Sequence, residues 1–86
     1  MPKLQAVNYR KVVKLVEKLG YSFVRQTGSH MRFMKLLESG EEHHITIPQH
    51  DELKKGTLND ILSRIAERNR MDKDVLIEML NELLLL

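Results

Sequence analysis

The spacing of apolar residues along the chain changes twice, and this constrains the possible fold more than any other feature. Between residues 8 and 19, apolar side chains recur every three or four positions, as on one face of a helix. Between residues 21 and 47 the period is close to two, which is typical of strands. From residue 57 onward the helical period returns, with a break at 69–72. The sequence therefore predicts a helix, a set of strands and two further helices.

The first helix should begin after Asn8 and end before Gly20. The Asn8 side chain can accept from free backbone N–H groups of a first helical turn. Gly20 follows the last apolar residue of the stripe, where a left-handed residue commonly ends a helix. The predicted stripe consists of Tyr9, Val12, Val13, Val16 and Leu19.

Three strands are predicted, at residues 21–26, 30–37 and 43–47, with turns that contain Gly28 and Gly40. Pro48 ends the third strand, because proline cannot donate to a β-ladder. Both connections are short, so the strands should form an antiparallel meander. The aromatic residues expected in the core are Tyr9, Phe23 and Phe33.

Thr57 is expected to open the second helix, with Asp60 as the acid of a capping box, and Asp72 is expected to cap the third. The predicted fold class is α+β. Two helices cover one face of a three-stranded antiparallel sheet (αβββα), a C-terminal helix follows, and the second face stays open. In that helix, Val75 to Leu80 should pack on the domain, and the leucines at 83–86 should offer a partner surface.

The chain has 86 residues, which suits one domain, with a core at about 4–70 and a C-terminal helical extension at about 72–86. The absence of cysteine excludes disulfides, thiolate nucleophiles and cysteine-ligated zinc, and favours a reducing compartment. No run of about 20 apolar residues is present, and no apolar segment suggests a secretory signal. We therefore expect a cytoplasmic protein without membrane contact.

Charge is distributed unevenly. Residues 1–37 contain eight Lys or Arg and one acid, whereas residues 38–86 contain six Lys or Arg and eleven acids. A basic half of this size suggests a polyanionic partner such as RNA, because clustered cations neutralise phosphates and release counterions. Ordinary solvated helix faces, for example the row Lys11, Lys14 and Lys18, are the alternative explanation.

His30 is the residue most suited to chemistry. It follows a glycine-containing turn at the start of the second strand. Strand alternation places it with Arg32 on one face, and places Met31 and Phe33 on the other, core face. A histidine can take or release a proton near neutral pH, as a general base requires. An exposed turn histidine without a role is the alternative.

Other residues could contact phosphate. Lys54 and Lys55 lie where a helix N-terminus is expected, and His50 lies in the preceding loop. Arg25, two residues before the turn, could reach the same phosphate as His30. Capping, solvation and ion pairing are the alternative roles of these side chains. No metal is expected at His43 and His44, since neighbours in a strand point to opposite faces.

Two groups of residues carry a resemblance to a known family. The first is Gly20-Tyr21, Val24-Arg25 and Gly28-Ser29-His30. The second is Ile47-Pro48, His50, the run from Glu52 to Leu58, Ile61-Leu62 and Ile65-Ala66. In this order and spacing they resemble the HicA toxins, over roughly residues 4–70.

The resemblance implies a fold like a double-stranded RNA-binding domain and the toxin of a type II toxin–antitoxin pair. Such toxins are endoribonucleases (mRNA interferases) that cleave mRNA and inhibit translation. The family's single catalytic histidine corresponds to His30, and neither metal nor cofactor is implied. The candidates for RNA or phosphate binding are Arg25, Ser29, Arg32, His50, Lys54 and Lys55.

The resemblance also implies a HicB-like antitoxin that covers the active-site face. A non-catalytic RNA-binding module of the same fold is the alternative to a nuclease. Because the few aromatic residues are expected in the core, little sequence specificity toward RNA is predicted.

Overall fold

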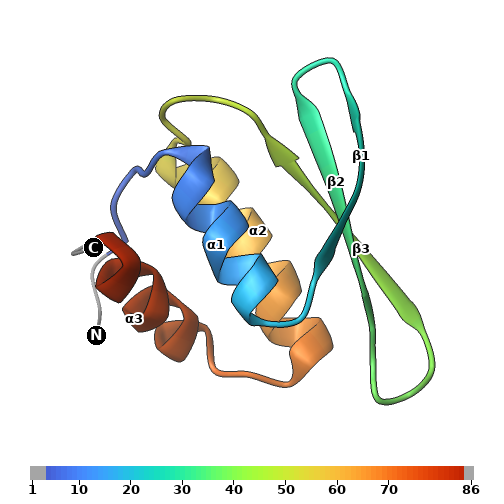
Figure 1. Cartoon of the computed structure of the whole chain (residues 1–86). Helices are drawn as coiled ribbons and strands as arrows, with labels where there is room; N and C mark the ends of the chain where they lie inside the picture. Colours follow the sequence, from blue (N-terminus) through green and yellow to red (C-terminus); the bar gives the residue numbers. More distant parts are fainter. Residues whose placement is uncertain (1–3, 85–86) are drawn as a thin grey trace.

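The computed structural model describes residues 4–84. Figure 1 shows the order of the elements, which is a helix, a meander of three strands and two helices. They are α1 (Tyr9–Lys18), β1 (Ser22–Thr27), β2 (His30–Leu36), β3 (Glu42–Pro48), α2 (Lys55–Asn69) and α3 (Lys73–Leu84). The predicted α+β class and the αβββα order with an added C-terminal helix are confirmed.

The sheet has the order β1-β2-β3, and both pairs are antiparallel. His30 is opposite Thr27 on β1 and opposite Pro48 on β3, so it lies at one end of the central strand. The register of β1 shifts between Phe23 and Arg25, which leaves Val24 as an extra residue without an opposite partner. Such a bulge locally increases strand twist and changes which side chains share a face.

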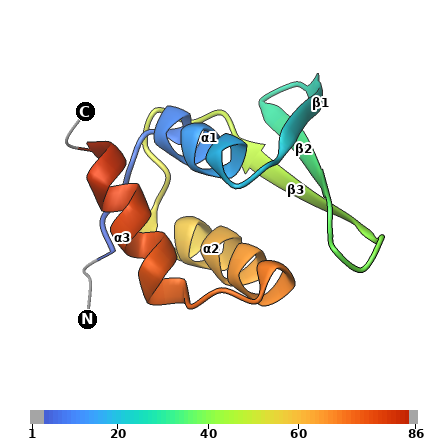
Figure 2. The same ribbon diagram turned by 60° about the horizontal axis from the view of Figure 1, so that its bottom comes forward.

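One face of the sheet packs against α1 and α2, and the other is open (Figures 1 and 2). On the covered face, Phe33 of β2 and Ile45 and Ile47 of β3 are buried. The third helix lies on the far side of the helical layer, away from the sheet (Figure 2). The residues that α1 and α2 bury in the core are Val12, Leu15, Val16, Leu58, Ile61, Leu62, Ile65 and Ala66.

Strand β1 extends beyond the helical layer, and all six of its residues are exposed. Phe23 is 52% exposed, although its ring lies edge-to-face with Phe33 at 5.7 Å between centroids. The prediction that Phe23 belongs to the core is therefore wrong. Tyr9 packs at the edge of the core and Phe33 lies inside it. The helices pack over β2 and β3. Nothing in the local sequence of β1 shows that the helical layer ends before this strand.

Three of the predicted helix ends are confirmed. The N–H of Arg10 donates to Asn8 Oδ1 at 2.9 Å, and the N–H of Asp74 donates to Asp72 Oδ1 at 2.8 Å. Gly20 has a φ of 101°, which residues other than glycine rarely adopt.

The predicted N-cap of α2, Thr57, is wrong by three residues. The helix begins at Lys55, and Lys54 is its N-cap, without a side-chain capping bond. The N–H of Leu58 donates to the carbonyl of Lys54 at 2.9 Å, so the first helical turn already contains Thr57. Thr57 and Asp60 therefore do not form a capping box.

Helix α3 contributes to the core, since Leu76, Ile77, Leu80 and Leu83 are buried. Lys11 Nζ of α1 donates to the carbonyl oxygen of Leu83 at 2.9 Å, near the negative end of the α3 dipole. Val75 is 44% exposed, so the expected packing of Val75 to Leu80 holds for part of this segment. Leu83, the first leucine of the expected partner surface, is buried in the core, so the expectation is wrong for this residue. The side chain of Leu84 and residues 85–86 lie outside what the structure describes. No helix among residues 4–84 is both long and apolar enough to span a membrane.

Candidate active site

His30 is held at the end of a tight hairpin. Because Thr27 and His30 are opposite each other, only Gly28 and Ser29 form the loop between β1 and β2. Gly28 has a φ of 58°, as the first residue of a type II′ turn requires, and a side chain rarely tolerates this value. The two-residue loop therefore places His30 directly on the sheet, where its side chain is exposed.

The predicted alternation along β2 is confirmed. Phe33 is buried against the helices, so His30 and Arg32 point to the open face of the sheet. Their Cα atoms are separated by two residues of strand, which is about 6.5–7 Å. One phosphate group can lie between side chains at this spacing.

Arg25 of β1 lies directly opposite Arg32. Opposed residues of an antiparallel pair point to the same face, with Cβ atoms about 4.5–5.5 Å apart. Like charges in this position destabilise a sheet unless an anion lies between them. We call Arg25, His30 and Arg32 the cationic patch.

The side chain of Arg32 has a partner on β3. Its Nε donates to His44 Nδ1 at 3.2 Å, and His44 Nε2 lies 3.4 Å from Glu42 Oε1. From the sequence, His44 was weighed only as a metal ligand, and no local pattern connects it with Arg32. Strand alternation already predicts that Glu42 and His44 share a face, but only the register of β2 against β3 shows that this is the face of Arg32.

Hydrogen bonds from two glutamines stabilise the turn that precedes His30. The N–H of Gln49 donates to the carbonyl of Ser29 at 2.6 Å. Gln26 Nε2 lies 2.9 Å from the carbonyl oxygen of Gly28 and 2.6 Å from Gln49 Oε1. Gln49 Nε2 donates in turn to the hydroxyl of Tyr9 at 3.1 Å, and this hydrogen bond lowers the pKa of Tyr9. Neither glutamine was singled out from the sequence.

The other predicted phosphate contacts lie in two places. Ser29 and His50 are both exposed. They lie at the same end of the sheet as His30, because the backbone N–H of Gln49, the neighbour of His50, donates to the carbonyl of Ser29. Lys54 and Lys55 are exposed where α2 begins. Figure 1 shows the loop after β3 leaving the sheet before α2 starts, so these lysines belong to the helical layer.

His43 has a structural role on the covered face. It is 8% exposed, and its Nδ1 lies 2.6 Å from the Tyr21 hydroxyl. Asn69 Nδ2 donates to the same hydroxyl at 2.9 Å, and Lys35 Nζ donates to Asn69 Oδ1 at 2.6 Å. Burial lowers the pKa of His43, and the positive charge of Arg68 lowers it further by a smaller amount. Burial raises the pKa of Tyr21.

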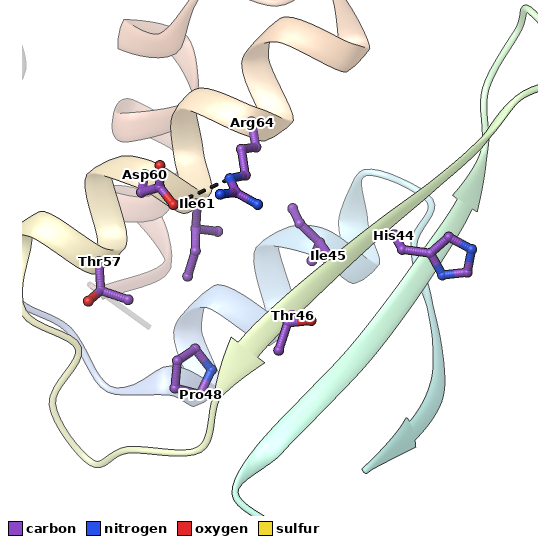
Figure 3. A pocket seen from close by; sticks show the side chains of 8 residues that line it. All are labelled: His44, Ile45, Thr46, Pro48, Thr57, Asp60, Ile61 and Arg64. Carbon is purple, nitrogen blue, oxygen red and sulfur yellow. Dashed lines mark ion pairs between the residues drawn. The ribbon is translucent and has the colours of Figure 1, made fainter. Parts of the chain in front are cut away.

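A pocket of about 190 Å³ lies between the free edge of β3 and α2. Figure 3 shows Ile45 pointing toward the helices and His44 pointing away on the other side of the strand. Arg64 and Asp60 form an ion pair at its α2 wall, with Nε and Oδ2 3.3 Å apart. His30 does not line this pocket, and its side chain is exposed on the sheet.

A comparison with protein families places this αβββα domain among the toxins of bacterial toxin–antitoxin systems. The model of the HicA toxin family matches residues 9–66, which include the whole sheet and the cationic patch. The chain belongs to the HicA toxin family, as the sequence resemblance suggested. Helix α3 lies outside the match. No curated protein and no solved structure matches the chain significantly. Membership in this family implies a toxin role and a cognate antitoxin.

Proposed function

We propose that this toxin is a metal-independent endoribonuclease that cleaves mRNA and so inhibits translation. The observation that supports this most is the exposed His30 with Arg25 and Arg32 on the same open face. Positive side chains attract the RNA backbone, and a histidine beside them can move a proton at neutral pH.

In the proposed reaction, neutral His30 takes the proton of a ribose 2′-hydroxyl. The 2′-oxygen then attacks the adjacent phosphorus, and the bond from phosphorus to the 5′-oxygen of the next nucleotide breaks. The leaving 5′-oxygen keeps the electron pair and takes a proton, from solvent or from the imidazolium. The products are a 2′,3′-cyclic phosphate and a 5′-hydroxyl.

Arg25 and Arg32 would stabilise the additional negative charge on the phosphorane oxygens. Such donors lower the barrier when they are already oriented before charge develops. Ser29 and His50, at the same end of the sheet, are proposed to contact the RNA beside the cleaved phosphate. Lys54 and Lys55, on the helical layer, are proposed to bind phosphates further along the strand.

We further propose that a HicB-like antitoxin inhibits the toxin by covering the open sheet face. The charge of the cationic patch supports a partner surface that presents acids. An acidic inhibitor and RNA would then compete for one surface.

The direct test is cleavage of a labelled RNA by the purified chain, with and without EDTA, followed by analysis of the new ends. We expect cleavage that EDTA does not prevent and that produces cyclic phosphates. Cleavage that depends on added metal and leaves 5′-phosphates would contradict the mechanism. Binding of RNA without any cleavage would favour a non-catalytic RNA-binding module instead.

A further inference from the structure

Both carbonyl groups of the two-residue loop before His30 accept a hydrogen bond. The carbonyl of Ser29 accepts from the backbone N–H of Gln49 at 2.6 Å, and the carbonyl of Gly28 accepts from Gln26 Nε2 at 2.9 Å. The carbonyl of Ser29 lies in the same peptide plane as the N–H of His30. Contacts that hold this plane therefore restrict the direction in which the His30 side chain leaves the strand.

The side chains of Gln26 and Gln49 meet across the end of the central strand. Gln26 is on β1 and Gln49 directly follows β3, so the two residues lie on opposite sides of β2. Their side chains are nevertheless bonded, with Gln26 Nε2 2.6 Å from Gln49 Oε1. Gln26 is opposite Met31, which packs against the core, so Gln26 shares the covered face and leaves the face of His30 free. We call the two side chains the glutamine bridge.

A backbone carbonyl fixes the direction of every hydrogen bond in the glutamine bridge. Because a carbonyl oxygen only accepts, Gln26 must present its NH₂ group to Gly28. The same NH₂ group has a second N–H, which donates to Gln49 Oε1. Gln49 Nε2 is then left to donate to the Tyr9 hydroxyl at 3.1 Å. Each of these donors thus faces an acceptor, from Tyr9 of α1 to the loop beside His30.

Tyr9 holds the residues after β3 at two points. Its hydroxyl accepts from the side chain of Gln49, and its backbone N–H donates to the carbonyl of His50 at 3.2 Å. Strand β1 extends beyond the helical layer and is exposed along its whole length (Figure 1), so helix packing gives this strand little support. The glutamine bridge therefore connects the end of the β1–β2 hairpin to the start of α1.

From these contacts we propose that Gln26 and Gln49 are positioning residues for His30. They hold the loop between β1 and β2 against the start of α1, so that the imidazole is oriented toward the reacting phosphate before RNA binds. The inference rests on the proposed nuclease function, since it takes His30 as the general base. Orientation of a reacting group lowers the barrier of the chemical step, so loss of the glutamine bridge should affect kcat more than KM.

The first experiment measures the loop without any activity. In ¹⁵N relaxation, rigid backbone amides have order parameters of about 0.85, and flexible ones have values below about 0.6. We expect the amides of Ser29 and His30 to be rigid in the wild type and flexible in Gln49→Met, which keeps the backbone N–H but loses both side-chain contacts. Gln5→Met, at an exposed glutamine outside the bridge, is the control and should resemble the wild type. Equal order parameters in the three proteins would overturn the proposal whatever the chain does to RNA.

The second experiment measures RNA cleavage. We expect Gln49→Met to lower kcat by about 10-fold with little change in KM, since a misplacement of about 1 Å can cost roughly 100-fold. Gln49→Glu should restore most of kcat, because its carboxylate can accept from both Gln26 and the Tyr9 hydroxyl. Its negative charge should raise KM for RNA, which separates the effect of charge from that of position. Gln5→Met should cleave as the wild type does.

RNA binding distinguishes positioning from direct contact with RNA. In the His30→Ala background, where we expect no cleavage, Gln49→Met should leave the affinity for RNA unchanged. A loss of affinity that accounts for the whole loss of kcat/KM, or a failure of Gln49→Glu to recover kcat, would overturn the positioning role. If the wild type does not cleave RNA, the proposed function fails, while the order parameters still decide whether the glutamine bridge holds the loop.

Discussion

At the scale of single residues, the four histidines of this toxin lie in different surroundings. His30 and His50 are exposed at one end of the sheet. His44 is tied to Arg32 and Glu42 on the open face, and His43 is buried against Tyr21. The same side chain can thus serve as a proposed base on the open face or as a buried hydrogen-bond partner in the core, depending on the face it occupies.

Replacement of His30 by Ala should abolish toxicity while the chain stays folded. Loss of a positioned general base costs about 10²–10⁴ in rate, and an exposed side chain contributes little to stability. The test is induced expression of wild type and variant, with growth, RNA integrity and the unfolding temperature of the purified proteins compared. A variant that arrests growth and degrades RNA at the wild-type rate would show that His30 is not the base.

The stability of the fold should decrease when the pH falls below about 6.5. Burial and nearby positive charges lower the pKa of His43 in the folded state, whereas an unfolded chain has a histidine pKa of about 6.5. The unfolded state therefore binds more protons in this window, so the free energy of unfolding is largest above pH 6.5 and falls toward the lower folded pKa.

Urea unfolding of the wild type and of His43→Leu between pH 8 and 5 measures this effect. The variant should show a weaker pH dependence, because its residue 43 does not titrate. His50→Ala is the matched control, since this exposed histidine should leave the dependence nearly unchanged. An identical pH profile in wild type and His43→Leu would show that another group controls acid stability.

At the scale of elements, the sheet and the start of α2 carry the two separate groups of cations. The cationic patch lies on β1 and β2, and Lys54 and Lys55 lie where α2 begins. The loop after β3 separates the cationic patch from Lys54 and Lys55. RNA that contacts both groups must therefore extend over one end of the molecule.

The double replacement of Lys54 and Lys55 by Ala should weaken RNA binding and reduce its dependence on salt. Each lost phosphate contact lowers the slope of log affinity against log salt by about 0.7–0.9. Binding should be measured in the His30→Ala background, so that cleavage does not interfere. Replacing Lys14 and Lys18 of α1 removes the same charge elsewhere and should change the slope less. An unchanged slope in the Lys54/Lys55 variant would mean that these lysines do not contact phosphate.

At the scale of the whole molecule, one sheet face is filled by helices and the other stays available. The helical layer and α3 supply the buried core, and none of the helices within residues 4–84 packs on the face that carries the cationic patch. A toxin of this family has an antitoxin, and the open basic face is the surface we expect that antitoxin to cover.

Hydrogen exchange of the toxin with and without its antitoxin tests this expectation. Protection should appear at residues 23–33 and 49–57, and association should slow as salt is raised, because an acidic partner is steered electrostatically. RNA binding to the preformed complex should be lost. Protection confined to α3, with RNA still bound by the complex, would indicate inhibition from a remote surface.

Much of this architecture follows from local signals in the sequence. The change of hydrophobic period predicts the element order, and Asn8, Gly20 and Asp72 mark helix ends that the structure confirms. Alternation along β2 also predicts that His30 and Arg32 face away from Phe33. These features depend on neighbours within a few positions, so they can be predicted from the local sequence.

Other features depend on how distant segments meet. Plain alternation would place Phe23 and Arg25 on one face, but the bulge at Val24 sends Phe23 to the helical side and leaves Arg25 opposite Arg32. The docking position of α1 and α2 leaves β1 uncovered, so Phe23 is exposed. The contact of His44 with Arg32 requires the register of β2 against β3. Register, bulges and helix docking are set by the best packing of the whole core, so local sequence patterns could not predict which arginines share the face of His30.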